Sequence, residues 1–157
     1  MSRRHSVARA RRLHAGRAAY GRGWLNDDDR ARDLRRTEWR IARSLWVNPG
    51  VQLTAIVRGA EVSNDASMVD ARQVGLEEVA RVIPNGSDIA GTSLAHVNDQ
   101  TRSILRESDL VISKGLANYE TLLGKGQNTY FLFLCKCALY VECFDVPLYT
   151  GMVVRGV

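Results

Sequence analysis

Residues 109–123 read DLVISKGLANYETLL, and this stretch decides the fold class. Its first five residues are largely apolar or β-branched, which is typical of a short strand buried inside a sheet. The strand leads directly into a polar loop at residues 114–118. Residues 119–123 then favour a helix that ends at the glycine-containing turn 124–126. A buried strand that passes at once into a loop and a helix indicates an α/β protein.

The same alternation continues on both sides of this stretch. Further strands are predicted at residues 51–58, 81–83, 129–135 and 152–155. Ser67 is placed to cap a helix over residues 68–74, with Asp70 on its exposed face. Asn98 is placed to cap another helix, and residues 136–144 fit either a helix or a continued strand. We therefore predict an α/β fold: a three-layer sandwich with a mostly parallel sheet, of which this chain holds an incomplete part.

The composition is that of an average globular protein. The chain has 157 residues, of which 45% are hydrophobic and 25% are charged. No run of about 18 apolar residues occurs, so we expect no membrane-spanning helix. The three cysteines, Cys135, Cys137 and Cys143, match neither a disulfide framework nor a zinc-binding spacing. We expect them to be reduced thiols, as in a cytoplasmic protein.

The positive charge is concentrated at the start of the chain. Residues 1–45 hold thirteen arginines, no lysine and five acidic residues, whereas residues 46–157 hold nine basic and twelve acidic ones. We therefore expect residues 1–47 to form a basic extension and residues 48–157 to form the folded part. The extension fits several interpretations: a nucleic-acid-binding arm, an organellar transit peptide, a disordered tail or a wrongly assigned gene start.

Polar residues follow three of the predicted strands. Asp65 comes after strand 51–58, and the loop 114–118 follows the strand quoted first. Lys136 comes after strand 129–135. Ligands of open α/β sheets bind beyond the carboxyl ends of the strands. We therefore expect these polar residues to share one edge of the sheet and to form a site there.

Each of these residues has a functional and a purely structural interpretation. The Asp65 carboxylate suits a hard divalent cation, and it equally suits an Asx turn or a helix cap. Lys114 and Gly115 suit a phosphate, because glycine admits close approach to the backbone, a helix start offers N–H donors and lysine adds positive charge. The structural alternatives are that Lys114 is a surface lysine and that Lys136 simply reaches solvent at the strand end.

Three segments of the chain together resemble one known family. They are VRGAEVSNDA at residues 57–66, DLVISKGLANYE at residues 109–120 and FLCKC at residues 133–137. In this order and spacing they resemble the damage-control phosphatases, a metal-dependent family long known only as a domain of unknown function. The resemblance implies hydrolysis of small phosphorylated metabolites, such as sugar phosphates. It also implies a divalent cation as cofactor: Mn²⁺, Mg²⁺, Co²⁺ or Ni²⁺.

The resemblance further implies roles for individual residues. It assigns Asp65 as a metal ligand and catalytic residue. It places Lys114, Gly115 and Asn118 in the loop that binds the phosphorylated substrate. It makes Lys136 a second lysine in contact with the phosphate.

The resemblance covers only residues 48–157, the C-terminal part of such an enzyme. The family carries a motif DNxGE shortly before the first segment, whose Asp and Asn supply further metal ligands, and residues 35–46 hold no Asp-Asn pair. We also expect no counterpart of the family's helical N-terminal domain within these residues. A hard cation held by one protein ligand is weakly bound, so we expect the chain alone to have little or no activity. The alternatives are a non-catalytic remnant that assembles with a partner, or a nucleic-acid-binding protein that uses the arginine-rich extension.

Overall fold

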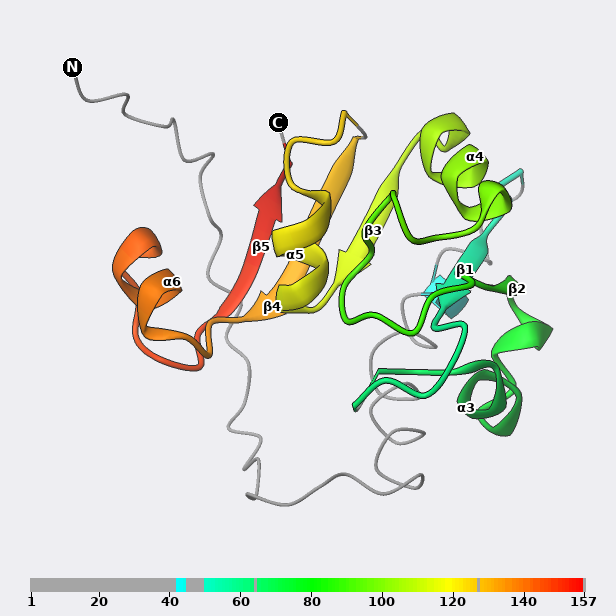
Figure 1. The fold of residues 1–157 in the computed structure, drawn as a ribbon, viewed down its shortest axis with the longest axis horizontal. Helices are drawn as coiled ribbons and strands as arrows, with labels where there is room; N and C mark the ends of the chain where they lie inside the picture. Colours follow the sequence, from blue (N-terminus) through cyan, green and yellow to red (C-terminus); the bar gives the residue numbers. More distant parts are fainter. Residues whose placement is uncertain (1–41, 45–49, 64, 127, 157) are drawn as a thin grey trace. The chain divides into compact units, whose positions relative to one another are not determined.

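The computed structural model describes residues 42–44, 50–63, 65–126 and 128–156. Within these ranges the chain divides into two compact units, residues 42–103 and residues 104–156. Each unit combines strands with helices (Figure 1). The basic extension predicted at residues 1–47 lies outside the described residues, apart from residues 42–44.

The first unit is built on a parallel pair of strands. β1 (Thr54–Val57) pairs with β2 (Arg81–Pro84) in parallel. The connection between them carries α3 (Met68–Gln73) and the short 3-10 helix η1 (Leu76–Glu78). Parallel strands need such a crossover, because a tight turn cannot bring the second strand back in the same direction. The carboxyl ends of β1 and β2 consequently lie at the same edge.

An apolar cluster holds α3 and η1 against the strands. Its buried members are Ala42, Val57, Ala71, Val74, Leu76 and Val79. Burying one valine or leucine side chain stabilises a fold by roughly 1.5–3 kcal/mol. The cluster therefore fixes the helical crossover and, with it, both ends of the loop that leads from β1 to α3.

The start of α3 is closed by a capping box. The Ser67 side chain accepts a hydrogen bond from the backbone N–H of Asp70, and Asp70 Oδ2 accepts one from the backbone N–H of Ser67 at 2.8 Å. The prediction that Asp70 lies on the exposed helix face is wrong, because the residue is only 3% exposed. Its carboxylate turns back to satisfy backbone and hydroxyl donors at the helix start.

The second unit is a three-stranded sheet in the order β3-β4-β5. β3 (Val111–Lys114) and β4 (Thr129–Leu134) run parallel, and β5 (Gly151–Arg155) runs antiparallel to β4. α5 (Leu116–Leu122) connects β3 to β4 and packs against both strands (Figure 1). α6 (Ala138–Phe144) follows β4. The remaining helix, α4 (Asp99–Glu107), contains the division between the two units.

Aromatic side chains fill the space between α5 and the sheet. Tyr119 of α5 lies edge-on to Phe131 of β4, with ring centroids 5.2 Å apart, and its ring centroid lies 4.9 Å from that of Phe133. Tyr140 and Phe144 of α6 extend the same cluster. Burial raises the pKa of Tyr119, and the nearby Cys143 raises it further. The Tyr119 hydroxyl therefore stays neutral, and the cluster joins α5 and α6 to β4.

Most of the predicted elements are confirmed, with shifted ends. The helix predicted at residues 119–123 begins earlier, at Leu116, because Gly115 turns the chain directly from β3 into α5. The open alternative at residues 136–144 is resolved in favour of a helix that begins at Ala138. The α/β class with parallel pairing is confirmed, and the three-layer stacking stays a prediction. In the part of the chain that the structure describes, no helix has the length and apolar character needed to cross a bilayer.

Candidate functional site

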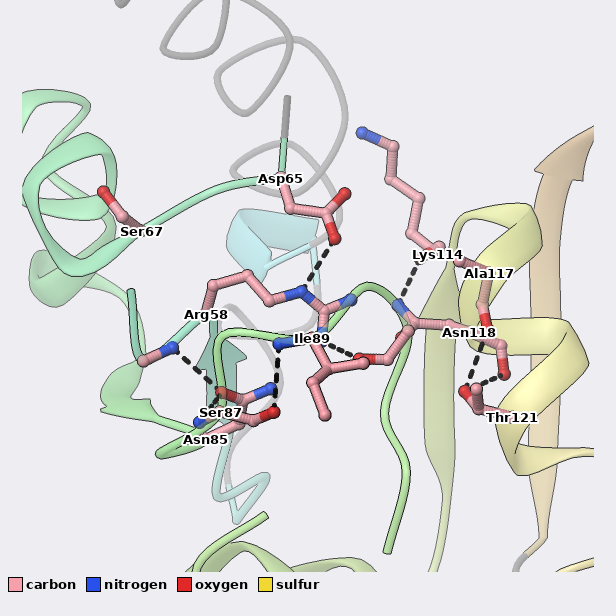
Figure 2. A network of polar contacts seen from close by, with 12 residues as sticks. Arg58, Asp65, Ser67, Asn85, Ser87, Ile89, Lys114, Ala117, Asn118 and Thr121 are labelled. Atoms are coloured by element: carbon pink, nitrogen blue, oxygen red, sulfur yellow. Dashed lines mark hydrogen bonds and ion pairs between the residues drawn. The ribbon is translucent and has the colours of Figure 1, made fainter. Parts of the chain in front are cut away.

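The loop after β1 is held by a buried arginine. The Arg58 side chain is 6% exposed, and its Nε donates to Asp65 Oδ2 at 2.7 Å (Figure 2). Its Nη1 donates to the carbonyl oxygen of Gly91, and its backbone N–H donates to the carbonyl oxygen of Ala66 at 2.8 Å. The Asp65 side chain is 37% exposed. Asp65 is thus fixed by a charge-assisted hydrogen bond while part of its carboxylate still reaches solvent.

A buried asparagine joins the loops that follow β1 and β2. Asn85, the residue after β2, is 1% exposed. Its Oδ1 accepts hydrogen bonds from the backbone N–H groups of Gly59 and Ser87, both at 2.9 Å (Figure 2). The loops also pack closely, since a Cβ on Gly59 would lie 2.7 Å from the Cα of Gly86. At the carboxyl edge of β1 and β2, the two loops that follow these strands are therefore hydrogen-bonded and closely packed against each other.

The described residues include one candidate ligand for a divalent cation, Asp65, and no complete metal site. Asp65 offers a half-exposed carboxylate, which is the oxygen donor that hard cations prefer. Mg²⁺ takes about six oxygen ligands, so a single carboxylate leaves most positions to water. Among residues 42–44, 50–63, 65–126 and 128–156, no three His, Cys, Asp or Glu side chains gather in a way that could hold a metal.

The end of β3 has the geometry of a loop open to a ligand. Gly115 lies between β3 and α5 with a φ of 102°, a conformation that side-chain-bearing residues rarely adopt. A Cβ built on Gly115 would meet none of the described residues within 4 Å, so the backbone is open there with respect to that part of the chain. The Gly115 N–H donates to the carbonyl oxygen of Leu132 at 2.8 Å. A ligand that approaches this loop would therefore meet the half-buried Lys114 and the first turn of α5, which has no side-chain cap.

Asn118 braces this loop from within α5. Its Nδ2 donates to the carbonyl oxygen of Lys114 at 2.7 Å (Figure 2). The hydrogen bond connects the first turn of the helix with the last residue of β3. The orientation of Lys114 relative to α5 is therefore set by a side chain from the same motif.

Lys136 lies at the same edge of the second unit as Lys114. Lys114 is opposite Leu132 in the parallel pairing, and Lys136 follows β4 by two residues with its side chain exposed. Cys135 beside it is buried, and burial raises the pKa of its thiol, an effect that the neighbouring Cys137 reinforces. Lys136 is thus an exposed residue that directly follows a buried cysteine whose thiol stays neutral.

The predicted site residues fall into two groups. Lys114, Gly115 and Asn118 follow the carboxyl end of β3, where Asn118 bonds to Lys114, and Lys136 follows the carboxyl end of the neighbouring parallel strand β4. Asp65 lies in the first unit, at the carboxyl end of β1.

Sequence reasoning missed Arg58 and Asn85, which hold the Asp65 loop in place. A charged residue that closes an apolar strand was the available signal for Arg58, because a buried guanidinium needs a paired carboxylate.

Comparisons with known proteins agree on one family. The sequence profile of the damage-control phosphatase ARMT1-like domain matches residues 41–151. The chain is similar to a damage-control phosphatase of Archaeoglobus fulgidus, with 39% identity over 88 residues, which cover 55% of this chain and 31% of that protein. It is also similar to a damage-control phosphatase of Pyrococcus horikoshii, with 32% identity over 87 residues, 55% of this chain and 30% of that protein.

The fold agrees with the sequence matches. A crystal structure of a DUF89 family protein from Pyrococcus horikoshii superposes with a TM-score of 0.63 and 27% identity, over 68% of this chain and 38% of that chain. The match spans only about a third of the length of these curated relatives. The matched profile nevertheless covers well over half of the chain, and the chain therefore belongs to the damage-control phosphatase ARMT1-like family.

Proposed function

We propose that residues 48–157 carry the phosphate-binding part of a metal-dependent phosphatase that acts on small phosphorylated metabolites, such as sugar phosphates. The observation that supports this most directly is the common edge of Lys114 and Lys136, two lysines that follow neighbouring parallel strands. Two cations at one sheet edge attract a phosphate dianion, because lysine acts on phosphate as a point charge.

The residues of this edge have complementary tasks in the proposal. Lys114 and Lys136 offset the charge of the phosphoryl oxygens. Gly115 leaves the space in which the phosphoryl group approaches the main chain, since no side chain of the described residues occupies it. Asn118 keeps the loop in shape through its hydrogen bond to the Lys114 carbonyl oxygen.

Asp65 provides one ligand for the divalent cation, Mn²⁺, Mg²⁺, Co²⁺ or Ni²⁺. In a metal-dependent phosphatase, the bound cation would supply a Lewis acid for the phosphoryl group. Because the described residues contribute a single carboxylate, we expect the isolated chain to bind phosphate better than it hydrolyses esters.

Phosphate binding is the first test. Amide chemical shifts of the full chain are followed while inorganic phosphate or glucose 6-phosphate is added. We expect shifts at residues 115–118 and near Lys136, and binding about tenfold weaker in Lys114→Ala, since the loss of one charged contact costs roughly 1.4 kcal/mol or more. Lys125→Ala is the matched control, because Lys125 is an exposed lysine in the turn after α5. Equal affinity of the two variants contradicts the proposal.

Hydrolysis is the second test. The chain is incubated with p-nitrophenyl phosphate and Mn²⁺ or Co²⁺, and any activity should disappear in Asp65→Ala. Phosphate binding at residues 115–118 without any metal-dependent hydrolysis would instead identify the chain as a non-catalytic remnant of the family.

A further inference from the structure

An exposed tyrosine precedes β5 in a strained backbone conformation. Residues 147–150 form a tight turn, in which the Thr150 N–H donates to the carbonyl oxygen of Pro147 at 3.2 Å. Tyr149 is the third residue of this turn and has a φ of 64°. Glycine or asparagine usually fills such a position, and a bulky residue there is an outlier of the kind that concentrates at functional sites. Tyr149 is 62% exposed, so burial contributes little to offset the strain.

The turn is fixed to the segment that carries Lys136. The Tyr149 N–H donates to the carbonyl oxygen of Cys135 at 2.7 Å, and the Cys135 N–H donates to the carbonyl oxygen of Thr150 at 2.9 Å. The Thr150 hydroxyl also donates to the carbonyl oxygen of Pro147 at 2.6 Å. Since Cys135 directly precedes Lys136, the backbone of Tyr149 is held beside that of the lysine.

Tyr149 lies at the end of the sheet where Lys114 and Lys136 follow their strands. β5 is antiparallel to β4, and its first residue, Gly151, is opposite Leu134, the last residue of β4. Figure 1 shows β5 starting at the end of the sheet where β3 and β4 finish. β3 and β5 flank β4. Neighbouring strands lie about 4.8 Å apart, so the end of β3 and the start of β5 are about 10 Å apart.

We propose that Tyr149 is a specificity-determining residue that contacts the ring of a sugar phosphate whose phosphate group is bound by Lys114 and Lys136. This inference rests on the phosphate-binding part of the proposed function and needs no cation. The separation across the three strands is comparable with the length of a hexose phosphate. A tyrosine ring offers an apolar face to the C–H groups of a sugar, and its hydroxyl can hydrogen-bond to a sugar hydroxyl. Small-molecule sites combine such aromatic contacts with a few charged groups.

Ligand titrations of the full chain test this proposal. Amide chemical shifts are followed while inorganic phosphate, glycerol 3-phosphate or glucose 6-phosphate is added. We expect the unaltered chain to bind glucose 6-phosphate most tightly of the three. Tyr149→Gly should weaken the binding of glucose 6-phosphate about fivefold or more, which is comparable with the loss of one aromatic side chain that stacks on a base. Its affinity for inorganic phosphate should be unchanged.

The choice of glycine separates binding from folding. Glycine adopts a positive φ without strain, so Tyr149→Gly should fold, as a urea midpoint close to that of the unaltered chain would show. Tyr149→Asn is a second variant without the ring, because asparagine also tolerates this conformation. Tyr149→Phe keeps the ring and should retain most of the preference for glucose 6-phosphate. Leu123→Ala is the matched control, since it removes a 40% exposed apolar side chain at the end of α5, in the connection that leads to the start of β4.

The outcomes separate this inference from the function on which it rests. Equal affinity of Tyr149→Gly and the unaltered chain for glucose 6-phosphate overturns the role of Tyr149 and leaves phosphate binding by the lysines in place. An equal loss for glycerol 3-phosphate and glucose 6-phosphate overturns recognition of the ring, whether or not inorganic phosphate is also bound more weakly. If the unaltered chain and Leu123→Ala bind none of the three ligands, the proposed phosphate site fails, and the inference fails with it.

Discussion

Replacing Gly59 by alanine should push apart the two loops that follow β1 and β2. A Cβ at this position would lie 2.7 Å from the Cα of Gly86 and 2.7 Å from the backbone nitrogen of Ser87. These are main-chain atoms in a segment held by the buried Asn85, so they cannot turn aside as a flexible side chain would. The Gly59 N–H also donates to Asn85 Oδ1 at 2.9 Å, and this bond would be stretched by the same displacement.

The expected loss follows from these two effects. Forcing an extra methyl group into a closely packed site costs about 1–3 kcal/mol. Weakening a buried hydrogen bond adds about 1 kcal/mol. We therefore expect Gly59→Ala to lower the free energy of opening of the first unit by about 2–4 kcal/mol.

Amide hydrogen exchange of β1 and β2 measures the free energy of opening of the first unit, because these strands become exposed when that unit opens. Gly124→Ala serves as the control. Gly124 lies in the second unit with a φ of 71°, and none of the described residues lies within 4 Å of a Cβ built on it, so the change introduces backbone strain without a clash among them. The steric argument is refuted if exchange of β1 in Gly59→Ala matches that of the unaltered chain.

Three further predictions concern buried polar groups. Thr101 Oγ1 is buried and finds no hydrogen-bond partner within the described residues, so Thr101→Val should preserve or raise stability by about 1 kcal/mol in urea unfolding; a clear loss would show that the hydroxyl has a partner. Iodoacetamide at mildly alkaline pH should modify the exposed Cys137 and Cys143 but not Cys135, whose thiol is buried with a raised pKa; mass spectrometry of the digested protein decides. Cys135 and Tyr119 both have raised pKa values, so the folded state keeps protons that the unfolded state releases. Stability should therefore be unaffected by these groups below about pH 9 and should fall as the pH rises above it, and an unchanged urea midpoint between about pH 8 and about pH 11 would contradict this.

Local pattern was sufficient for the α/β class and for most of the elements. The strands at residues 51–58 and 109–113 could be predicted because β-branched residues favour strands through preferences that act within a few residues. The polar residues after each run marked the end of the strand in the same local way. The same locality explains why Gly115 could be recognised as a turn between strand and helix. Membership of the phosphatase family also followed from short segments, because their residues are contiguous in the chain.

Pairings between distant residues were beyond such reasoning. Asp70 is a local exception: its partner Ser67 is only three residues away, but helix periodicity alone predicted an exposed carboxylate and did not reveal that it folds back on the helix start. Arg58 and Asn85 passed unnoticed because their roles depend on loops 7 to 33 residues away, as the contacts of Arg58 with Asp65 and Gly91 illustrate. Burial and hydrogen-bond satisfaction are properties of the assembled chain. A linear string of residue types specifies which groups need partners, and folding alone selects the partners they find.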